Sequence, residues 1–338
     1  MSIVTVQVGQ CGNQLGSSLF DALYHHSCDP TPLADSTKPG GRKSGTQSYS
    51  RTDGDAFAEA SACRRCFFRN KGTVARAVVV DTEPKVIQQI IAKGVIGSKA
   101  LQSNGTQTQS AKSRGEEWGG GGSHWSYGGG TQVCCRAQGG AANNWAYGYH
   151  RYGARFSEAC LESVRREAER CDHLAGLCIL HSAAGGTGSG LGTFLTEALR
   201  DDLPSAFLLN TVVCAPSSGE VILQNYNTMF TLSKLARCSD GVLVIENEGA
   251  TEVCRKLLRI SRPSHSDLNR VIAGSLVGAL IPSEGAVGGS RRGGGGGRLH
   301  LAEKLAHLCP NKDFMFLRTS MLPQMPDTSR AFTTNTWE

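Results

Sequence analysis

The residues best suited to chemistry lie in one glycine-rich stretch, residues 181–192, with the sequence HSAAGGTGSGLG. An apolar run, residues 177–180, precedes it, and a helix-like segment, residues 193–200, follows it. A short strand that turns through glycines into a helix directs backbone N–H groups and the helix N-terminus at phosphate oxygens. Five glycines with Thr187 and Ser189 between them make a turn without a ligand the less favoured alternative. The stretch therefore predicts a phosphate-binding loop.

Two common phosphate motifs do not match this stretch. A Walker loop requires Lys directly after its last glycine, whereas Leu191 follows Gly190, and the glycine spacing is not G-x-G-x-x-G. Residues 184–190, AGGTGSG, instead resemble the G-G-G-T-G-S-G loop of the tubulin/FtsZ family of GTPases, with Ala184 in place of the first glycine. The resemblance implies that the nucleotide contacts come from Ser182, Gly185, Gly186, Thr187, Gly188, Ser189 and Gly190.

A second strand-glycine-helix unit opens the chain. Ile3 to Val8 reads as a buried strand, residues 9–14 form a glycine-containing loop, and an amphipathic helix is expected from Leu15 to about His25. Taken alone, the unit fits a tight strand-to-helix turn equally well. The hexapeptide GQCGNQ is, however, identical to the N-terminal loop of tubulins, which narrows the resemblance from the superfamily to tubulins. It implies that Gln10 and Cys11 contact the nucleotide.

Two carboxylates follow the next clear strand, Thr73 to Val80. Asp81 and Glu83 stand at its carboxyl end, before an expected helix from Lys85 to Ala92. Carboxylates placed in this way can hold Mg²⁺ through water, because Mg²⁺ that bridges phosphates keeps most of its hydration shell. Acidic residues and a proline at a helix start are also common as caps. The match to the D-x-E-P loop of tubulins favours Mg²⁺, with Glu83 preferred to Asp81.

Further positions of the nucleotide site follow only from the resemblance. Residues 139–148 resemble the tubulin loop G-A-G-N-N-W-A-x-G, which implies that Asn143 donates its amide to a terminal phosphate. An aromatic-anchored surface loop is the alternative. Glu220 stands where tubulins keep an Asp near the ribose, and residues 224–227 depart from the family's E-P-Y-N. These departures put the sugar contacts in question.

The base of the nucleotide is assigned in the same way. Asn247 and Asn269 match the two tubulin asparagines that face guanine, and a carboxamide can pair with the N1–H, N2 and O6 edge of that base. His265 stands at the position of a base-stacking aromatic residue. Stacking contributes about 1–3 kcal/mol per base in nucleic-acid sites, so His265 should hold the base less firmly than Tyr. A surface histidine is the alternative reading.

A catalytic role is implied for one glutamate. Counted back from Pro310, Glu303 falls where the α-type tubulin subunit keeps the glutamate that activates water on its neighbour's GTP. Two other polar positions of that family loop read Arg298 and His300. A solvated helix glutamate is the favoured alternative. Two alternatives for the enzyme activity therefore stay open: a weak GTPase that a neighbouring subunit completes, or no catalytic role for this glutamate.

Strands that end in functional loops and are separated by helices predict an α/β fold with a doubly wound, mostly parallel sheet. We expect a GTP-binding domain over residues 1–282, with low-complexity insertions at about 28–72 and 94–138, to which no fold is assigned beyond a short helix near residues 57–67. A glycine-rich linker, 283–298, follows. Residues 299–338 would begin an incomplete intermediate α+β domain, with a helix from Leu299 to Leu308 and a strand from Asp313 to Thr319, because a full tubulin continues further.

Composition limits the cellular setting. The chain has 338 residues, 42 glycines, 13 cysteines and a formal net charge of +6. Its N-terminus lacks the charged and apolar regions of a secretory signal, so reduced thiols and a cytosolic location are expected. No apolar run reaches the roughly 20 residues of a membrane helix. The basic residues are scattered without interleaved aromatics, which argues against nucleic acid as a partner.

The function implied is that of a GTP-binding cytoskeletal protein, most similar to the delta-tubulins. The opening MSIVTV, residues 219–227 and the stretch NNWAYGY carry this closer likeness. It implies a role at centrioles and basal bodies, with other tubulin subunits or microtubule ends as partners. A GTP-binding capping or regulatory factor that does not polymerise is an alternative. A nicotinamide-dependent oxidoreductase is disfavoured, because Asp201 and Asp202 precede the next strand instead of closing it.

Overall fold

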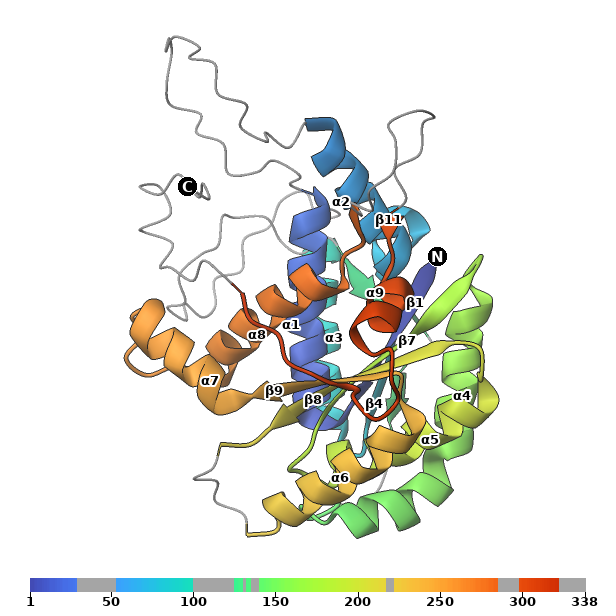
Figure 1. Ribbon diagram of the computed structural model, residues 1–338, viewed down its shortest axis with the longest axis vertical. Helices are drawn as coiled ribbons and strands as arrows, with labels where there is room; N and C mark the ends of the chain where they lie inside the picture. The colour runs from blue at the N-terminus through green and yellow to red at the C-terminus, as the bar shows by residue number, and fades with distance from the viewer. Residues whose placement is uncertain are drawn as a thin grey trace.

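The computed structural model describes residues 1–28, 53–99, 125–129, 132–134, 140–216, 222–284 and 298–321. Within these ranges a seven-stranded sheet of order β12-β9-β8-β7-β1-β4-β6 has parallel neighbours throughout (Figure 1). Its strands are β1 (Ser2–Val8), β4 (Ala77–Asp81), β6 (Gln132–Cys134), β7 (Leu174–Ser182), β8 (Phe207–Cys214), β9 (Gly241–Glu246) and β12 (Phe316–Leu317). The strand order reverses between β1 and β7, which confirms the doubly wound α/β fold.

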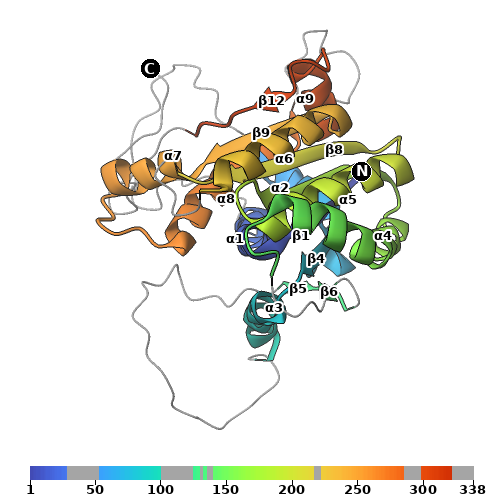
Figure 2. The same ribbon diagram turned by 90° about the horizontal axis from the view of Figure 1, so that it is seen from below.

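Helices cover both faces of this sheet (Figure 1). One face carries α1 (Gly9–Cys28), α2 (Asp53–Phe67), α3 (Pro84–Lys99), α7 (Asn247–Glu252) and α8 (His265–Leu280). The other carries α4 (Ala154–Glu169), α5 (Gly192–Asp202) and α6 (Gln224–Cys238). Figure 2 shows β12 with α9 (Leu301–Leu308) at one edge of the molecule and β6 with α3 at the other. No helix in the described ranges is long and apolar enough to span a membrane.

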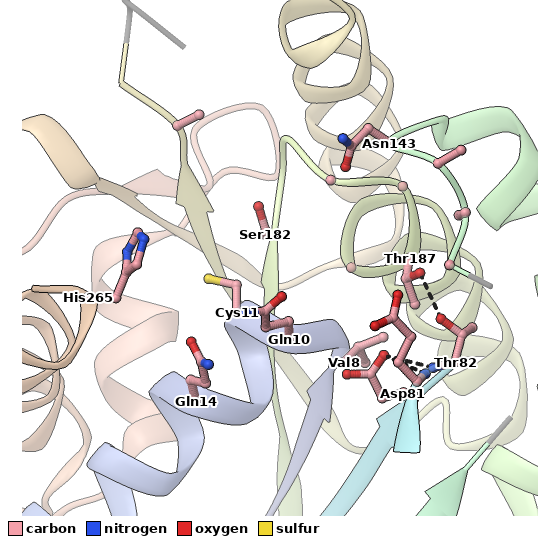
Figure 3. Close-up of a pocket in the computed structure, with 18 of the residues that line it drawn as sticks. Val8, Gln10, Cys11, Gln14, Asp81, Thr82, Asn143, Ser182, Thr187 and His265 are labelled. Atoms are coloured by element: carbon pink, nitrogen blue, oxygen red, sulfur yellow. Dashed lines mark hydrogen bonds between the residues drawn. The ribbon is translucent and has the colours of Figure 1, made fainter. Parts of the chain in front are cut away.

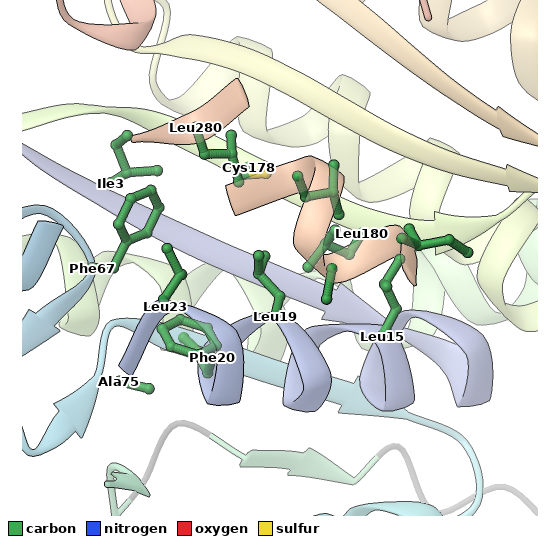
Figure 4. Close-up of a cluster of buried hydrophobic side chains, with 14 of the residues drawn as sticks. Ile3, Leu15, Leu19, Phe20, Leu23, Phe67, Ala75, Cys178, Leu180 and Leu280 are labelled. Atoms are coloured by element: carbon green, nitrogen blue, oxygen red, sulfur yellow. The ribbon is translucent and has the colours of Figure 1, made fainter. Parts of the chain in front are cut away.

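The core follows from the period-two pattern of the strands. In β1, Val4 and Val6 face α4 and α5, whereas Ile3 faces the opposite side with α1. On α1, Leu15, Leu19 and Leu23 recur at helical spacing and pack against β7 and α8 (Figure 4). Burial of each such side chain stabilises the fold by about 1.5–3 kcal/mol. The central strand β1 is thereby held by helices on both faces of the sheet. Its carboxyl end lies at the end of the sheet where the carboxyl ends of the parallel strands meet.

The strand expected from Thr73 to Val80 is broken into two. Residues Val74–Ala75 (β3) join a small sheet with β2 (Phe68–Arg69) and β5 (Ser126–Tyr127), and β4 joins the main sheet. Arg76 lies at the break, where its backbone N–H donates to Phe67 O at 2.8 Å and its Nε to Phe68 O at 3.1 Å. The buried guanidinium takes the carbonyls of Phe68 and Arg170 as partners, and the chain changes sheets there.

The expectation that residues 94–138 carry no fold is wrong for the described parts. Helix α3 continues to Lys99, and β5 and β6 follow within this region. Trp125 and Tyr127 are buried against Phe20, and Trp125 Nε1 donates to Asp21 Oδ1 at 2.9 Å. Two aromatic side chains supply enough apolar burial to fix a segment whose average composition is polar.

Other expected elements differ at their ends. Helix α1 begins at Gly9, so residues 9–14 form its first turns instead of a loop. The short helix near 57–67 is the longer α2. Of the strand expected at 313–319, only Phe316–Leu317 pairs, as the parallel edge strand β12 beside β9. Strands β10 (Ser283–Glu284) and β11 (Arg298–Leu299) pair antiparallel at the two ends of residues 285–297, which lie outside the described residues.

Candidate functional site

A cavity of about 650 Å³ opens at the carboxyl edge of the sheet, where the strand order reverses (Figure 3). Open α/β sheets bind ligands at this kind of switch point. The structure brings together here most of the residues that the sequence singled out: Gln10, Cys11, Asp81, Glu83, Asn143, Ser182, Gly185, Gly186, Thr187, Gly188, Asn247, His265 and Asn269. They come from six segments of the chain, so the cavity is a product of the tertiary fold.

Four expected residues do not line the cavity. Ser189 and Gly190 are buried behind the glycine loop, where the Ser189 hydroxyl donates to Gly185 O. Glu220 lies outside the described residues. Glu303 is exposed on α9, away from the cavity. The lining includes eight residues that the sequence did not single out: Val8, Gln14, Thr82, Gly140, Ala141, Ala142, Ala215 and Leu268.

Glu303 lies at the opposite end of the sheet from the cavity. Helix α9 packs at the amino end of β9, with Leu305 against Gly241. The neighbouring Lys304 donates through Nζ to Ile281 O at 2.7 Å, just past the carboxyl end of α8. Helix α8 begins at the cavity and has 16 residues, which at 1.5 Å per residue spans about 24 Å. Glu303 itself accepts from the backbone N–H of His300 at 3.0 Å and caps α9.

Two helix starts converge on the cavity. Helix α1 begins directly after β1, and the π-helical segment η3 (Thr187–Leu191) runs on into α5. Gly9 has φ +73°, and a Cβ there would lie 3.0 Å from Gly188 N, so a side chain at this position would separate the two segments. The close approach of α1 and η3 therefore places the N-terminal N–H groups of two helices around the cavity, together with the partial positive charge of helix N-termini. Such a space favours an anion.

The loop after β4 is organised by Asp81. Its Oδ1 accepts from Thr82 N at 2.8 Å and Glu83 N at 3.3 Å, and its Oδ2 accepts from Asn13 Nδ2 at 3.3 Å. Burial raises the pKa of Asp81 above its ordinary value. Glu83, by contrast, is exposed at the cavity. The two carboxylates therefore differ: Asp81 shapes the loop, and Glu83 is exposed where the loop lines the cavity.

Thr82 joins this acidic loop to the glycine loop. Its Oγ1 lies 3.2 Å from Oγ1 of Thr187, although 105 residues separate the two in the chain (Figure 3). Thr82 is only 1% exposed, whereas Thr187 is half-buried. The position of Thr82 between two carboxylates is a signal that could have singled it out in the sequence. That Thr187 is the partner of its hydroxyl could not be predicted from the sequence.

The loop that carries Asn143 adopts an unusual conformation and is held by one side chain. Ala142 and Asn143 have φ of +46° and +54°, the left-handed region that few residues other than glycine adopt. Asn227 Nδ2 donates to Asn143 O and to Ala184 O, both at 2.7 Å, and its Oδ1 accepts from Trp145 N at 3.1 Å. Asn227 therefore ties the Asn143 loop to the glycine loop.

The other end of the cavity has a different character. Asn247 begins α7, and His265 and Asn269 lie one helical turn apart at the start of α8. A capping box, in which Ser264 and Asp267 bond each other's side chains and backbone, fixes this helix start. Carboxamides beside a ring can bind the edge and face of a planar base. Gln14 and Leu268, which line the same end, follow Gln10 and His265 at helical spacing, a signal that could have found them.

Cys11 stands between the two ends (Figure 3). Burial raises the pKa of its thiol to about 12, so the sulfur stays neutral and does not repel an anion. The cysteines whose side chains the structure describes are all free thiols.

Comparison with known proteins assigns the family. The family model described as Tubulin/FtsZ family, GTPase domain, matches residues 2–255. The chain is 38% identical to the tubulin delta chains of Mus musculus and Homo sapiens, over 100% of this chain and 64% of each relative. It is 33% identical to the tubulin beta-1 chain of Colletotrichum gloeosporioides, over 83% of this chain and 55% of the relative. The chain thus spans less than two thirds of the length of these relatives.

The family match covers the strands and most of the loops that build the cavity, from β1 into η4 (Val253–Leu257), and ends before His265, Leu268 and Asn269. The delta-chain likeness extends over all of this chain. Fold, cavity and sequence agree, and we conclude that this chain belongs to the tubulin family and is similar to tubulin delta chains.

Proposed function

We propose that this chain binds GTP and GDP in the cavity at the carboxyl edge of the sheet. The observation that carries the proposal is the convergence of two helix N-termini at one end and two asparagines with a histidine at the other. The first arrangement suits phosphates and the second suits guanine. A volume of about 650 Å³ lies within the usual range of about 300–1,000 Å³ for small-molecule sites.

Within this site, each end has its own task. The N–H groups of Gly185 to Gly188, with Gln10, Cys11, Ser182 and Asn143, would contact the phosphates. Asn247 and Asn269 would pair with the guanine edge while His265 stacks on its face. Ser189 and Gly190 support the loop from behind. Glu220 remains the proposed ribose contact, although it lies outside the described residues.

Mg²⁺ is proposed to accompany the nucleotide. No group of three or more His, Cys, Asp and Glu side chains in the described ranges could hold a metal ion alone. A Mg²⁺ ion would therefore need phosphate oxygens and water in its shell, which is its usual arrangement at nucleotides. The exposed carboxylate of Glu83 fits a contact through water, whereas the oxygens of Asp81 already accept hydrogen bonds from the loop.

Two exposed apolar patches suggest how neighbouring subunits would pack. One patch, at the cavity end of the sheet, consists of Ile222, Leu223, Tyr226, Met229 and Phe230 at the start of α6. The other, beside the amino end of β9, consists of Leu308, Phe314 and Phe316. Different patches at opposite ends favour a heterologous, head-to-tail contact. The proposed partners are other tubulin subunits or microtubule ends.

Such a contact would bring Glu303 of one subunit toward the nucleotide of the next, because Glu303 lies at the end opposite the cavity. The proposed activity is a weak GTPase completed between subunits. The similarity to delta chains supports a cytoplasmic, cytoskeletal location at centrioles and basal bodies. Hydrolysis that rises with protein concentration would support the shared site, and a rate per subunit independent of concentration would count against it.

The capping-factor alternative is favoured by one observation. Glu303 accepts from His300 N and acts as a helix cap, a task that needs no neighbour. Sedimentation of the purified chain with GTP and Mg²⁺ distinguishes the two cases. Polymers favour a subunit of a filament, whereas binding to microtubule ends without polymers of its own favours a cap.

Nucleotide identity tests the proposal directly. We would purify the chain, denature it and identify the released nucleotide by chromatography, for the wild type, an Asn247→Ala, Asn269→Ala variant and an Asn225→Ala control. Asn225 is exposed on α6, outside the cavity. Guanine nucleotide from the wild type and the control, but not from the double variant, is the expected result. A folded wild type that carries no guanine nucleotide and takes up no GTP with Mg²⁺ would refute the proposal.

A further inference from the structure

The hydroxyl pair between the acidic loop and the glycine loop points to a second layer of phosphate recognition. Thr82 comes from the end of β4 and Thr187 from the start of η3, and both line the cavity. We propose that Thr82 is a positioning residue: it orients the Thr187 hydroxyl toward the terminal phosphate and so favours the triphosphate over the diphosphate. This inference rests on the proposed binding of guanine nucleotides.

The position of the pair along the cavity identifies which phosphate it serves. In Figure 3, His265 lies at one end, Cys11 and Ser182 lie in the middle, and Thr82 and Thr187 lie at the other end. A nucleotide with its base at His265 extends its phosphate chain toward the threonines. The last phosphate therefore reaches the pair, while the earlier phosphates lie nearer the middle of the cavity.

Counting the protons explains why one hydroxyl needs the other. Each threonine hydroxyl has a single proton, and the 3.2 Å contact uses one of the two. Thr82 is 1% exposed, and its backbone N–H is fixed by Asp81 Oδ1 at 2.8 Å. When Thr82 donates to Thr187, the proton of Thr187 is left to point into the cavity. Thr187 is the more exposed partner, so its hydroxyl is the one that can reach a phosphate oxygen.

Without Thr82, the Thr187 hydroxyl would rotate freely or bond a nearby carbonyl, and its donation to phosphate would be weakened. A hydrogen bond to a charged acceptor is strong enough that its loss lowers affinity about ten-fold. The diphosphate does not reach the pair, so its affinity should change by less than about two-fold. A merely structural threonine would change both affinities together.

The test compares three variants by titration with fluorescent GDP and a fluorescent non-hydrolysable GTP analogue, both with Mg²⁺. Thr82→Val keeps the shape and removes the hydroxyl, and Thr82→Ser keeps the hydroxyl. Thr231→Val is the matched control, because Thr231 is fully buried on α6 and its Oγ1 has no hydrogen-bond partner in the described structure. We expect Thr82→Val to lose about ten-fold in affinity for the triphosphate only, and the other two variants to resemble the wild type.

A double-mutant cycle with Thr187→Val tests whether Thr82 acts through Thr187. If it does, adding Thr82→Val to Thr187→Val should weaken triphosphate binding no further, since the effects of coupled residues are not additive. Additive losses, equal losses for both nucleotides, no loss at all, or failure of Thr82→Ser to restore binding would each overturn the inference. Should Thr82→Val fail to fold, Thr82→Ala, which removes the same hydroxyl, takes its place in the titration and in the cycle.

The outcome for the wild type separates the two proposals. A wild type that binds neither nucleotide refutes the guanine-nucleotide function, and the role of Thr82 falls with it. A wild type that binds both, with a Thr82→Val variant indistinguishable from it, refutes only the role of Thr82.

Discussion

The imidazole of His181 and the carboxamide of Asn210 form a fully buried polar pair beneath the glycine loop. His181 Nε2 lies 3.3 Å from Asn210 Oδ1, and Nδ1 lies 3.3 Å from Ser182 O. Burial lowers the pKa of His181 to about 4, so the ring is neutral at pH 7 and has one N–H. Since Asn210 Oδ1 can only accept, the pair sets both the tautomer of His181 and the geometry under Ser182, a residue of the cavity.

We expect the proton of neutral His181 to reside on Nε2, donating to Asn210 Oδ1. The amide is oriented by two hydroxyls, because Asn210 Oδ1 also accepts from Thr196 Oγ1 at 3.1 Å and Asn210 Nδ2 donates to Ser239 Oγ at 2.9 Å. Nitrogen chemical shifts of the ring, measured by NMR at pH 7, distinguish the tautomers. A protonated Nδ1 would contradict this assignment.

His181 should also make stability depend on pH. Its pKa is about 4 in the folded chain and about 6.5 when unfolded, so between these values the unfolded chain binds more protons. Stability therefore falls as the pH drops from about 6.5 to about 4, by about 3 kcal/mol in total. Urea unfolding of the wild type and His181→Gln at pH 7 and pH 5 measures it. Asp81, with its raised pKa, acts in the opposite direction, so only the difference between the two proteins isolates His181.

Neighbouring glycines of the phosphate loop should respond differently to alanine. A Cβ on Gly186 would lie 2.7 Å from both Ala141 Cβ and Asn144 N, whereas a Cβ on Gly185 meets only Asn143 Oδ1, at 4.0 Å. Gly186→Ala should cost about 1–3 kcal/mol of stability through overpacking and displace the Asn143 loop. Gly185→Ala should leave the melting temperature unchanged while its methyl group weakens nucleotide binding.

Thermal unfolding and nucleotide titration of both variants separate these effects. Equal melting temperatures for the two variants would mean that the Asn143 loop moves to accommodate the methyl group of Gly186→Ala without loss of stability. That outcome would contradict the predicted overpacking at Gly186.

Asn227 should be required for both stability and nucleotide binding. Its side chain makes three hydrogen bonds, to Asn143, Ala184 and Trp145, and it is 3% exposed. Asn227→Ala removes the partner of the buried Trp145 N–H and of the partly buried carbonyl bonds to Asn143 and Ala184, which should cost about 2–4 kcal/mol. Nucleotide affinity should fall with it, because the Asn143 loop loses its tie to the glycine loop. The exposed Asn225→Ala is the control; a variant of Asn227 as stable as that control would disprove the role.

His265 should limit the affinity for the base. It is exposed at the start of α8, where its ring can reach the face of guanine. His265→Tyr should tighten guanine nucleotide binding several-fold and His265→Ala should weaken it, since stacking is worth about 1–3 kcal/mol per base. Titration against the exposed His307→Tyr control checks this. Identical affinities for the Tyr and Ala variants would show that position 265 does not stack on the base.

The sequence determined the elements whose signals are local. The apolar runs of β1 and β7 and the helices α1 and α9 were predicted within a few residues, because the pattern of apolar side chains reflects burial directly. The glycine loop, the GQCGNQ segment and the D-x-E-P loop were identified from residue types in fixed spacing, and the fold gathers them around one cavity. These segments are recognisable alone because glycine conformation and helix starts depend on neighbours in the chain.

The tertiary structure decided what depends on distant residues. Only the fold shows that Thr82 meets Thr187, that Asn227 joins two loops, and that Glu303 lies at the far end of the sheet. It also gives Trp125 and Tyr127 a place in the core despite the polar sequence around them. Such contacts join residues far apart in the chain, and their energy comes from burial and hydrogen bonds that exist only once the sheet has assembled.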